Sequence, residues 1–222
     1  MLVNGVHLLP DLSGAVYWPA RRLLAVADLH LEKGSALARR GVLLPPYDTR
    51  ATLDRLGGLL RRHAPRTVVC LGDSFHDAGG PGRMVEAEAE ELRRMVAARE
   101  WIWIAGNHDP APAGDLGGEW APELAVDGLV FRHAPLPDAA PGEVAGHLHP
   151  KATVGVGGQR VSRPCFVTDG RRLVLPAFGA YAGGLDVLDP AWRPLFPRRA
   201  FDVVMLGGDR LHTLPRGRLL AG

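Results

Sequence analysis

Five short apolar runs in this chain each end at residues whose side chains can bind a metal ion. They are LLAVA before Asp28 and His30, VVCLG before Asp73, WIWIAG before Asn107 and His108, LVFR before His133, and VAG before His147 and His149. In an open α/β sheet, the loops at the carboxyl ends of strands converge on one crevice, so side chains far apart in sequence can meet there. Buried carboxylates are costly unless a cation pairs with them, and a metal ion supplies that pairing. The pattern therefore predicts a two-metal site, which is typical of a hydrolase.

The first half of the chain predicts alternating strands and helices. After a short strand pair over residues 6–9 and 15–18, we expect strands over residues 23–27, 67–71 and 101–105 and helices over residues 33–40, 48–63 and 83–99. Asp48 or Thr49 is expected to cap the second of these helices.

From residue 129 onward, Gly and Pro turns separate short expected strands. These cover residues 129–132, 144–146, 153–156, 166–168, 173–175, 185–188, 203–206 and 210–213. The chain has 222 residues and shows no internal repeat or long linker. We therefore expect a single domain spanning residues 1–222, with an α/β first half and a β-rich second half.

Composition excludes several classes of protein. No run reaches the roughly 18 apolar residues of a membrane span, and the first residues lack the order of a signal peptide, so a cytoplasmic protein without a membrane partner is expected. Cys70 and Cys165 lie in apolar runs without CxxC spacing, which favours buried free thiols. A net charge of +2 falls short of a nucleic-acid-binding arm by composition alone.

The motifs differ in how strongly each indicates a metal site. The D-x-H of Asp28 and His30 is a weak signal alone, and so is Asp73 after a glycine. GNHD is stronger, because glycine lets the backbone turn sharply while Asn107 and His108 are presented together, although an ordinary Asn-His turn is the alternative. GHLH places two imidazoles on one face of an extended strand, where the alternative is a pair of surface histidines. Six of the nine histidines lie at these strand ends, namely His30, His76, His108, His133, His147 and His149.

The order D-x-H, GD-x-x-H, GNHD, H and GH-x-H resembles the calcineurin-like metallophosphoesterase superfamily over the first 150 residues. The segment GDSFH, residues 72–76, is similar to the variant found in Mre11-type nucleases. The stretches ADLHLEKGSALARRGVLLPPYDTR, GDSFHD, GHLHPKA and LPAFGAYAGGLDV closely resemble the bacterial ligase-associated DNA damage response endonucleases of the PdeM type. This second resemblance reaches to about Leu188.

The resemblance implies a four-layer αββα sandwich, in which helices flank two mixed β-sheets, and a manganese-dependent phosphodiesterase that cleaves single-stranded DNA. Carried over motif by motif, the metal-binding roles fall to Asp28, His30 and His149 for a first ion, Asp73 as the bridge, and Asn107, His133 and His147 for a second ion. His108 is then catalytic, placed over the substrate phosphate to stabilise the transition state or to protonate the leaving oxygen. The nuclease-type variant further implies that His76 contacts the substrate.

The chemistry of these residue types agrees with the implied roles. Two cations about 3.5–4 Å apart lower the pKa of a bridging water, so that a hydroxide can attack phosphorus in line. Asp73 suits the bridge because a carboxylate has two oxygens, and the neutral oxygen of Asn107 leaves positive charge to stabilise the developing phosphorane. Oxygen and imidazole ligands suit Mn²⁺, Fe²⁺ or Zn²⁺, so the preference for manganese rests on the resemblance.

Substrate contacts are less defined by the sequence. Cations follow the first and last metal motifs and are expected to track a DNA backbone, namely Lys33, Arg39, Arg40 and Lys151, although solvated faces are the alternative. The rings of Phe75, Phe178 and Tyr181 either stack on bases or pack in the core. Loops rich in glycine and proline, over residues 78–82 and 110–118, are expected to shape access to the site.

Three functions remain open at this point. The first is an endonuclease for single-stranded DNA, acting in repair in association with the DNA ligase and helicase that the family name implies. The second is a hydrolase of a small phosphodiester or nucleotide. The third is a non-catalytic binding scaffold on the same fold, which is disfavoured because every ligand position is filled.

Overall fold

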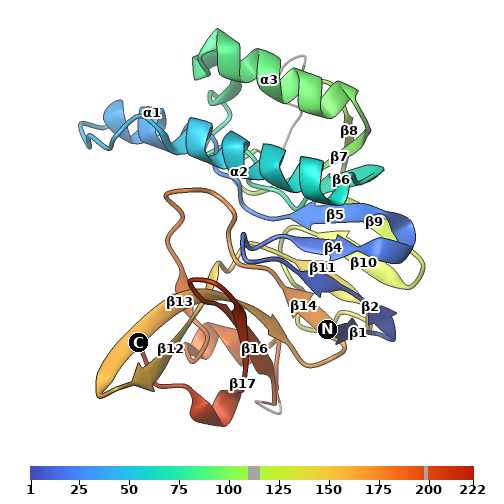
Figure 1. The fold of residues 1–222 in the computed structure, drawn as a ribbon, viewed down its shortest axis with the longest axis vertical. Helices are drawn as coiled ribbons and strands as arrows, with labels where there is room; N and C mark the ends of the chain where they lie inside the picture. Colours follow the sequence, from blue (N-terminus) through green and yellow to red (C-terminus); the bar gives the residue numbers. More distant parts are fainter. Residues whose placement is uncertain (110–115, 198–199) are drawn as a thin grey trace.

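The computed structural model describes residues 1–109, 116–197 and 200–222. Two large mixed β-sheets lie face to face, and α-helices cover the outer face of the first sheet (Figure 1). Buried side chains from both sheets fill the space between them, among them Val69 and Ile104 from the first sheet and Phe131 and Phe166 from the second. The architecture is therefore mixed α/β, as the sequence predicts.

The first sheet orders its strands β3-β4-β5-β6-β7-β8. Strands β5 to β8 run parallel, whereas the β3–β4 and β4–β5 pairs are antiparallel. Strands β5 and β6 are buried along their whole length, as expected for parallel strands covered on both faces. The bounds are β3 Leu9–Pro10, β4 Val16–Trp18, β5 Leu23–Val26, β6 Thr67–Cys70, β7 Glu100–Ile104 and β8 Glu119–Ala121.

The helices α1 (Lys33–Ala38), α2 (Asp48–His63) and α3 (Glu86–Ala97) connect the parallel strands. Leu53 and Leu56 on α2 and Leu92 on α3 belong to one buried cluster with residues of β5, β6 and β7. Because β5, β6 and β7 run parallel, the loops that follow them emerge together at the carboxyl edge of the sheet.

The start of α2 is held differently from the predicted cap. Its N-cap position is Tyr47, which makes no side-chain capping bond. Asp48 accepts a 2.9 Å hydrogen bond from the Gly34 backbone N–H. The Thr49 hydroxyl accepts from the backbone N–H of Glu32 and donates to the Glu32 carboxylate, both at 2.9 Å. Both side chains therefore tie α2 to the start of α1, directly after the first metal motif.

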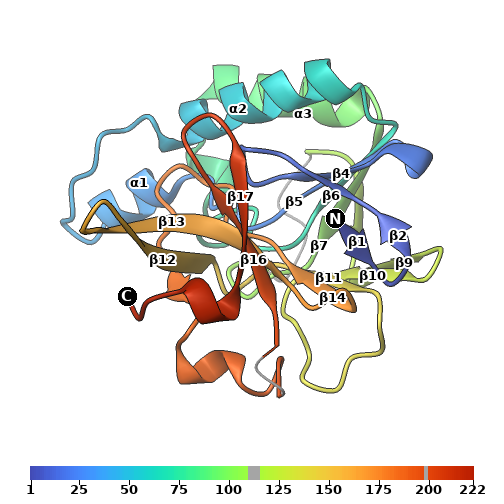
Figure 2. The same cartoon turned by 60° about the horizontal axis from the view of Figure 1, so that its bottom comes forward.

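The second sheet orders its strands β15-β12-β13-β14-β11-β10-β9, and the β16–β17 hairpin joins it through β13. Strands β10, β11 and β14 run parallel to one another, so this sheet also has adjacent carboxyl ends. The β12–β13 hairpin projects on the same side of the molecule as α1 (Figure 2). The bounds are β9 Glu123–Val126, β10 Leu129–Arg132, β11 Glu143–Ala145, β12 Pro150–Val156, β13 Gln159–Thr168, β14 Arg172–Val174, β15 Leu185–Asp186, β16 Asp202–Leu206 and β17 Leu211–Pro215.

Smaller elements complete the described chain. A short antiparallel hairpin, β1 (Leu2–Val3) and β2 (Val6–His7), forms a separate sheet. The 3₁₀ turns are η1 (Pro19–Arg21), η2 (Pro81–Arg83), η3 (Pro190–Trp192) and η4 (Arg216–Arg218).

The fourth, helical layer that the family resemblance implies is not built from α-helices in the described part of the chain. After α3, the described residues form strands, loops and short 3₁₀ turns such as η3. Trp192, Phe196 and Phe201 cover the outer face of the second sheet in a cluster with side chains of β12, β13 and β16. Pro194 and Pro197 lie within this covering segment and remove backbone donors that a helix requires. Bulky apolar side chains on an irregular segment thus replace the expected helices.

Two predictions about composition can be compared with the structure. Cys70 and Cys165 are buried and free, as predicted. Within the described residues, no helix has both the length and the apolar composition needed to cross a membrane.

Candidate metal centre

The predicted ligand residues follow strands of both sheets. Those from the first sheet follow β5 (Asp28 and His30), β6 (Asp73) and β7 (Asn107), and those from the second follow β10 (His133) and β11 (His147 and His149). The predicted catalytic residue His108 directly follows Asn107. Helix α1 begins soon after His30 and β12 directly after His149, so the site faces the side on which these two elements project (Figure 1). The two sheets therefore bring the predicted aspartates and histidines at these strand ends to one place.

A first group of ligand-type atoms lies around Asp28. Ligand atoms of Asp28, His30 and His149 all lie within 4.8 Å of one another. The Nε2 atoms of His30 and His149 are 3.3 Å apart, and Nε2 of His149 is 3.4 Å from Oδ1 of Asp28. These three side chains can hold one metal ion.

A second group lies around Asp73. Ligand atoms of Asp73, His133 and His147 also lie within 4.8 Å of one another. Nε2 of His133 is 3.5 Å from Oδ1 of Asp73, and Nδ1 of His147 is 3.0 Å from Nε2 of His133. The other oxygen, Oδ2 of Asp73, is 3.9 Å from Nε2 of His30. Asp73 therefore lies between the two groups, with one oxygen toward each.

His108 belongs to a third grouping with His30 and Asp73. Its Nε2 is 3.9 Å from Oδ2 of Asp73, and its side chain is 44% exposed, in contrast to the buried Asp73. Its Nδ1 donates a 2.7 Å hydrogen bond to the His76 carbonyl oxygen, and the two imidazole rings stack with centroids 5.1 Å apart. Both histidines therefore lie at the solvent side of the centre, and Asn107 is exposed in the same loop as His108.

The residues present fit divalent cations by several observations. Asp28 is completely buried, and its Oδ1 has no hydrogen-bond partner among the described residues. An ionised, buried oxygen without a partner is unstable unless a cation pairs with it. Burial, followed by the charges of His149 and other neighbours, lowers the pKa of His30 to about 2. Burial and the adjacent His133 also lower the pKa of His147. Neutral imidazole is the form that binds a metal.

Hydrogen bonds at the far side of the rings orient the candidate ligands. Nδ1 of His133 lies 2.9 Å from the Leu71 carbonyl oxygen, which only accepts, so the proton is on Nδ1 and the lone pair of Nε2 can coordinate a metal ion. Oδ2 of Asp28 accepts from the backbone N–H of His147, and Oδ1 of Asp73 accepts from the backbone N–H of His108, both at 2.9 Å. Each carboxylate is thus fixed by the backbone of another ligand loop.

Backbone strain is concentrated at the same residues. Positive φ angles occur at Asp28 (53°), His30 (44°), Asp73 (47°), His147 (71°) and His149 (46°). Residues with a Cβ rarely adopt this conformation, which costs on the order of 1–3 kcal/mol each and clusters at functional sites. The surrounding structure must offset this strain energy to keep the five side chains grouped at the centre.

Glycines next to the ligands permit the close approach of the loops. A Cβ at Gly106 would lie 2.1 Å from the backbone nitrogen of Asp73, and a Cβ at Gly146 would lie 2.6 Å from Oδ2 of Asp28. Both contacts are shorter than van der Waals distance, so any larger residue would displace a carboxylate. Gly106 of GNHD is therefore needed for the close packing of its loop against Asp73, in addition to the predicted sharp turn.

Asp109, the last residue of GNHD, was not predicted from the sequence to have a role, but it supports the loop of Asp73. It is 2% exposed, and its Oδ2 accepts hydrogen bonds from the backbone N–H groups of Ser74 at 2.7 Å and Phe75 at 3.1 Å. Burial raises the pKa of Asp109 to about 6. The side chain fixes the loop that carries Asp73, and its position directly after the Asn-His pair was the signal available in the sequence.

The predicted substrate cations lie on α1, directly after α1 and on β12. The charge of Lys33, at the first position of α1, acts on both His30 and His76, and the charge of Arg40 acts on His76. Arg39 follows α1, and Lys151 lies on β12 with its side chain against Gly184. Within the described residues, none of the four predicted cations forms an ion pair.

The predicted stacking residues are mostly core residues. Phe75 and Phe178 are completely buried, which confirms core packing for both rings. Tyr181 is partly buried and donates a 2.8 Å hydrogen bond from its hydroxyl to the Pro45 carbonyl oxygen. The loop over residues 78–82 includes the start of η2, while residues 110–115 of the second predicted access loop lie outside the described residues.

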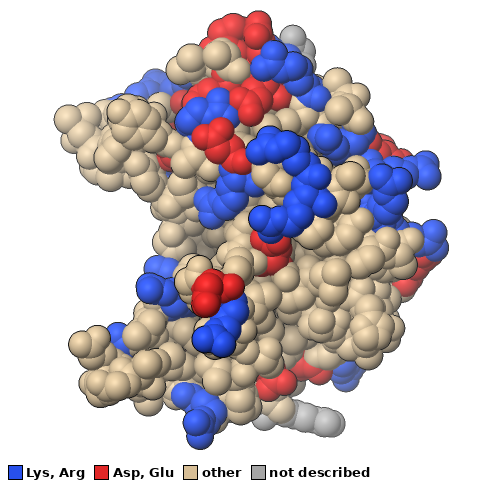
Figure 3. Space-filling view, in the orientation of Figure 1, with Lys and Arg blue, Asp and Glu red and all other residues tan. Residues whose placement is uncertain are grey.

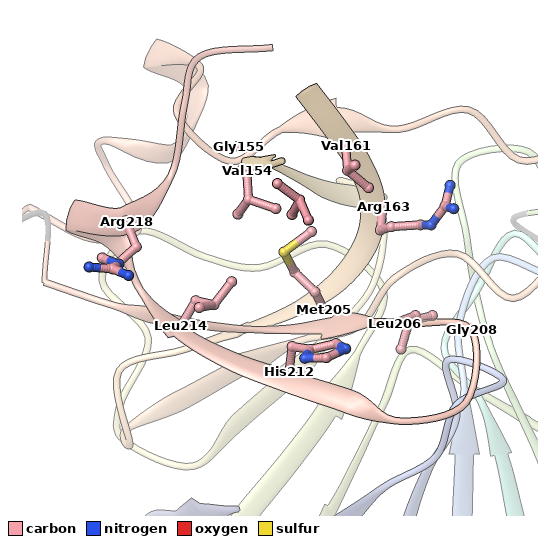
Figure 4. Close-up of a pocket in the computed structure, with 12 residues that line it drawn as sticks. Val154, Gly155, Val161, Arg163, Met205, Leu206, Gly208, His212, Leu214 and Arg218 are labelled. Atoms are coloured by element: carbon pink, nitrogen blue, oxygen red, sulfur yellow. The ribbon is translucent and has the colours of Figure 1, made fainter. Parts of the chain in front are cut away.

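The surface beside the centre is hollowed. Figure 3 shows a concavity between the projection at α1 and the projection of the β12–β13 hairpin, with Lys and Arg side chains along its border. A different cavity of about 400 Å³ lies between the β12–β13 and β16–β17 hairpins. Figure 4 shows Val154, Val161 and Met205 at its centre, and its lining contains none of the predicted ligands.

Comparison with known proteins agrees with this geometry. The sequence matches the calcineurin-like phosphoesterase family over residues 21–158. Among solved structures, nuclease MPE of Pseudomonas putida is 32% identical over 96% of this chain and 98% of that protein, with a TM-score of 0.76. The phosphoesterase Yfce of E. coli is 14% identical over 86% of this chain and 97% of that protein, with a TM-score of 0.42. No match was found among curated proteins. The residues matched to the family contain every candidate ligand at the strand ends, and this chain belongs to the calcineurin-like phosphoesterases.

Proposed function

We propose that this phosphoesterase is a two-metal phosphodiesterase that cleaves single-stranded DNA internally. The observation that carries the proposal is the position of Asp73, with His30 3.9 Å from one carboxylate oxygen and His133 3.5 Å from the other. A carboxylate whose oxygens face separate groups of imidazoles suits a bridge between two ions. The 32% identity to a P. putida nuclease supports a nucleic acid as the substrate.

The proposed ligand sets follow the two groups described above. Asp28, His30 and His149 hold one ion, His133 and His147 hold the other, and Asp73 is shared. From the family resemblance, Asn107 is added to the second ion; it is exposed beside His108. When bound, such a pair of ions activates water for in-line attack on phosphorus and withdraws charge from the phosphate. Manganese is proposed from the family resemblance, while iron or zinc suits the same donors.

His108 has the position expected of an acid that protonates the leaving oxygen. Its Nδ1 donates to the His76 carbonyl, and this hydrogen bond orients the ring and leaves Nε2 as the nitrogen that can exchange a proton with the substrate. Nε2 faces the centre beside Oδ2 of Asp73 and is exposed enough to meet a substrate. The stacked ring of His76 supports this orientation and is proposed to contact the substrate.

Four predicted cations that form no ion pair within the described residues favour a polyanionic substrate. Lys33 and Arg40 act electrostatically on the histidines of the centre. We assign phosphates on the α1 side to Lys33, Arg39 and Arg40, and a phosphate on the β12 side to Lys151. A role in DNA repair, with functional association with a ligase and a helicase, is proposed from the resemblance.

Incubation of purified protein with circular single-stranded DNA tests the activity. Wild-type protein with Mn²⁺ is expected to linearise the circle, and parallel reactions with Fe²⁺, Zn²⁺ and chelator establish the metal. A His108→Ala variant purified in the same way is the control for contaminating nucleases.

Two outcomes would contradict the proposal. Equal cleavage by wild type and by His108→Ala assigns the activity to a contaminant. Hydrolysis of cyclic nucleotides or nucleotide pyrophosphates with no cleavage of the circle favours the alternative function, a phosphoesterase for small substrates.

A further inference from the structure

The connection between α1 and α2 exposes an unusual number of apolar side chains. Val42 is 50% exposed, Leu43 83%, Leu44 36% and Tyr47 68%. We call these four residues the apolar lip. Single exposed apolar residues are common, but several in one short segment mark a binding surface.

The backbone that carries the apolar lip is fixed by hydrogen bonds. The Val42 N–H donates to the Leu37 carbonyl at 3.0 Å, and the Pro45 carbonyl accepts from the Tyr47 N–H at 2.9 Å and from the Tyr181 hydroxyl at 2.8 Å. Pro45 and Pro46 further restrict the chain at the middle of the segment. The side chains are therefore held outward on an ordered support.

The apolar lip continues directly from the cationic side of the metal centre. Lys33 begins α1 and Arg40 follows its end, and the charges of both act on His76 beside the centre. The lip starts two residues after Arg40. In Figures 1 and 3, the α1–α2 connection forms the projection above the hollow, and side chains that are neither acidic nor basic cover it. Along this part of the chain, His30 of the centre is thus followed by the cations Lys33 and Arg40 and then by the apolar lip.

We propose that the apolar lip binds unpaired nucleobases of a DNA strand whose phosphates lie against Lys33 and Arg40. Base faces are apolar and stack on aromatic rings, so Tyr47 offers a stacking platform and Leu43 an apolar contact beside it. Bases inside a duplex are stacked on each other and cannot reach these side chains. The lip thereby selects single strands, and the inference rests on the proposed nuclease function.

A lip variant and a matched control variant test this inference. Leu43→Ser/Tyr47→Ala removes apolar surface from the lip, and Leu2→Ser/Leu9→Ser removes exposed apolar surface (48% and 50% exposed) from β1 and β3, outside the α1–α2 connection. Binding of a fluorescent oligothymidylate, and of a strand of the same length that lacks bases, is measured by anisotropy. Cleavage of the oligothymidylate and of bis-p-nitrophenyl phosphate is measured with Mn²⁺.

The lip variant is expected to bind and cleave oligothymidylate at least about fivefold more weakly than wild type, because a stacked base contributes about that factor or more. Its binding of the baseless strand and its activity on the small diester stay at the wild-type level, and the control variant matches wild type throughout. Unchanged oligothymidylate binding in the lip variant, or an equal loss on the baseless strand, overturns the inference. A wild type inactive on both substrates contradicts the proposed function instead, while the binding measurements still decide the role of the lip.

Discussion

The two sheets contribute different chemistry to the metal centre. Both candidate carboxylate ligands, Asp28 and Asp73, follow parallel strands of the first sheet, and the second sheet adds imidazoles, His133, His147 and His149. The first sheet thus supplies both carboxylates, and the second supplies imidazoles that complete each group. Neither sheet alone forms either group, so the centre assembles only when the sheets pack together.

Both contributions share a strained backbone. Asp28 and Asp73 on one side, and His147 and His149 on the other, have positive φ angles. The cores between and outside the sheets provide the stability that permits this strain. We therefore expect removal of the shared carboxylate to reduce metal binding and activity much more than removal of a single imidazole.

Removing the shared carboxylate has the largest expected effect. Asp73→Ala should abolish binding of both ions and lower phosphodiesterase activity by at least about 10³-fold, because both groups lose a donor and the negative charge between them. The loss of ions is measured by plasma mass spectrometry, and the loss of activity is measured on bis-p-nitrophenyl phosphate. Asp209→Ala, which removes an 84% exposed carboxylate in the β16–β17 turn, serves as the control. Two ions retained in Asp73→Ala would refute the bridging role.

Removing one imidazole from the second sheet has a smaller expected effect. His147→Ala and His149→Ala should each lower the metal content from about two ions to about one, because each residue belongs to only one group. The exposed His212 on β17 provides the matched control, His212→Ala. If either variant lost both ions, the division into two groups would be wrong.

Asp109 acts through the loop that carries Asp73. Asp109→Ala should weaken metal affinity about 10–100-fold, as for other groups that orient ligands, while Asp109→Asn restores most of it because the amide oxygen still accepts from Ser74 and Phe75. The metal affinities of the two variants are compared by titrating the metal and measuring phosphodiesterase activity at each concentration. Equal impairment of both would indicate that the charge of Asp109, rather than its acceptor geometry, matters.

Metal removal from the wild-type protein is expected to lower the stability of the fold, and this is the smallest of the expected effects. Ions present at about 100 times their dissociation constant stabilise the folded state by about 2.7 kcal/mol, so chelation should lower Tm by about 5–10 °C. Differential scanning calorimetry with and without chelator measures this shift. The His147→Ala variant should show a smaller shift than wild type, and an unchanged Tm in wild type would show that folding does not depend on bound ions.

The sequence predicted which residues come together at the centre better than it predicted the strands away from it. The strand ends were predictable because polar residues after buried runs have few alternatives, and all predicted histidines of both groups converge. The strands β8 and β9 were missed, since they have only three and four residues and none of their side chains is fully buried. The first half of β13 was missed for a similar reason, because its side chains up to Pro164 are largely exposed.

The apolar lip and Asp109 were missed for a different reason. The exposure of Leu43 and Tyr47 depends on how the α1–α2 connection is held by Tyr181, more than a hundred residues away in sequence. Asp109 orients a loop thirty-five residues away. Both roles arise from tertiary contacts, which a local pattern does not encode.

Anomalous scattering from a crystal grown with Mn²⁺ tests the central claim most directly. The account predicts two manganese peaks, one beside Asp28, His30 and His149 and one beside His133 and His147, with a carboxylate oxygen of Asp73 toward each. A single peak, or two peaks without Asp73 between them, would contradict it.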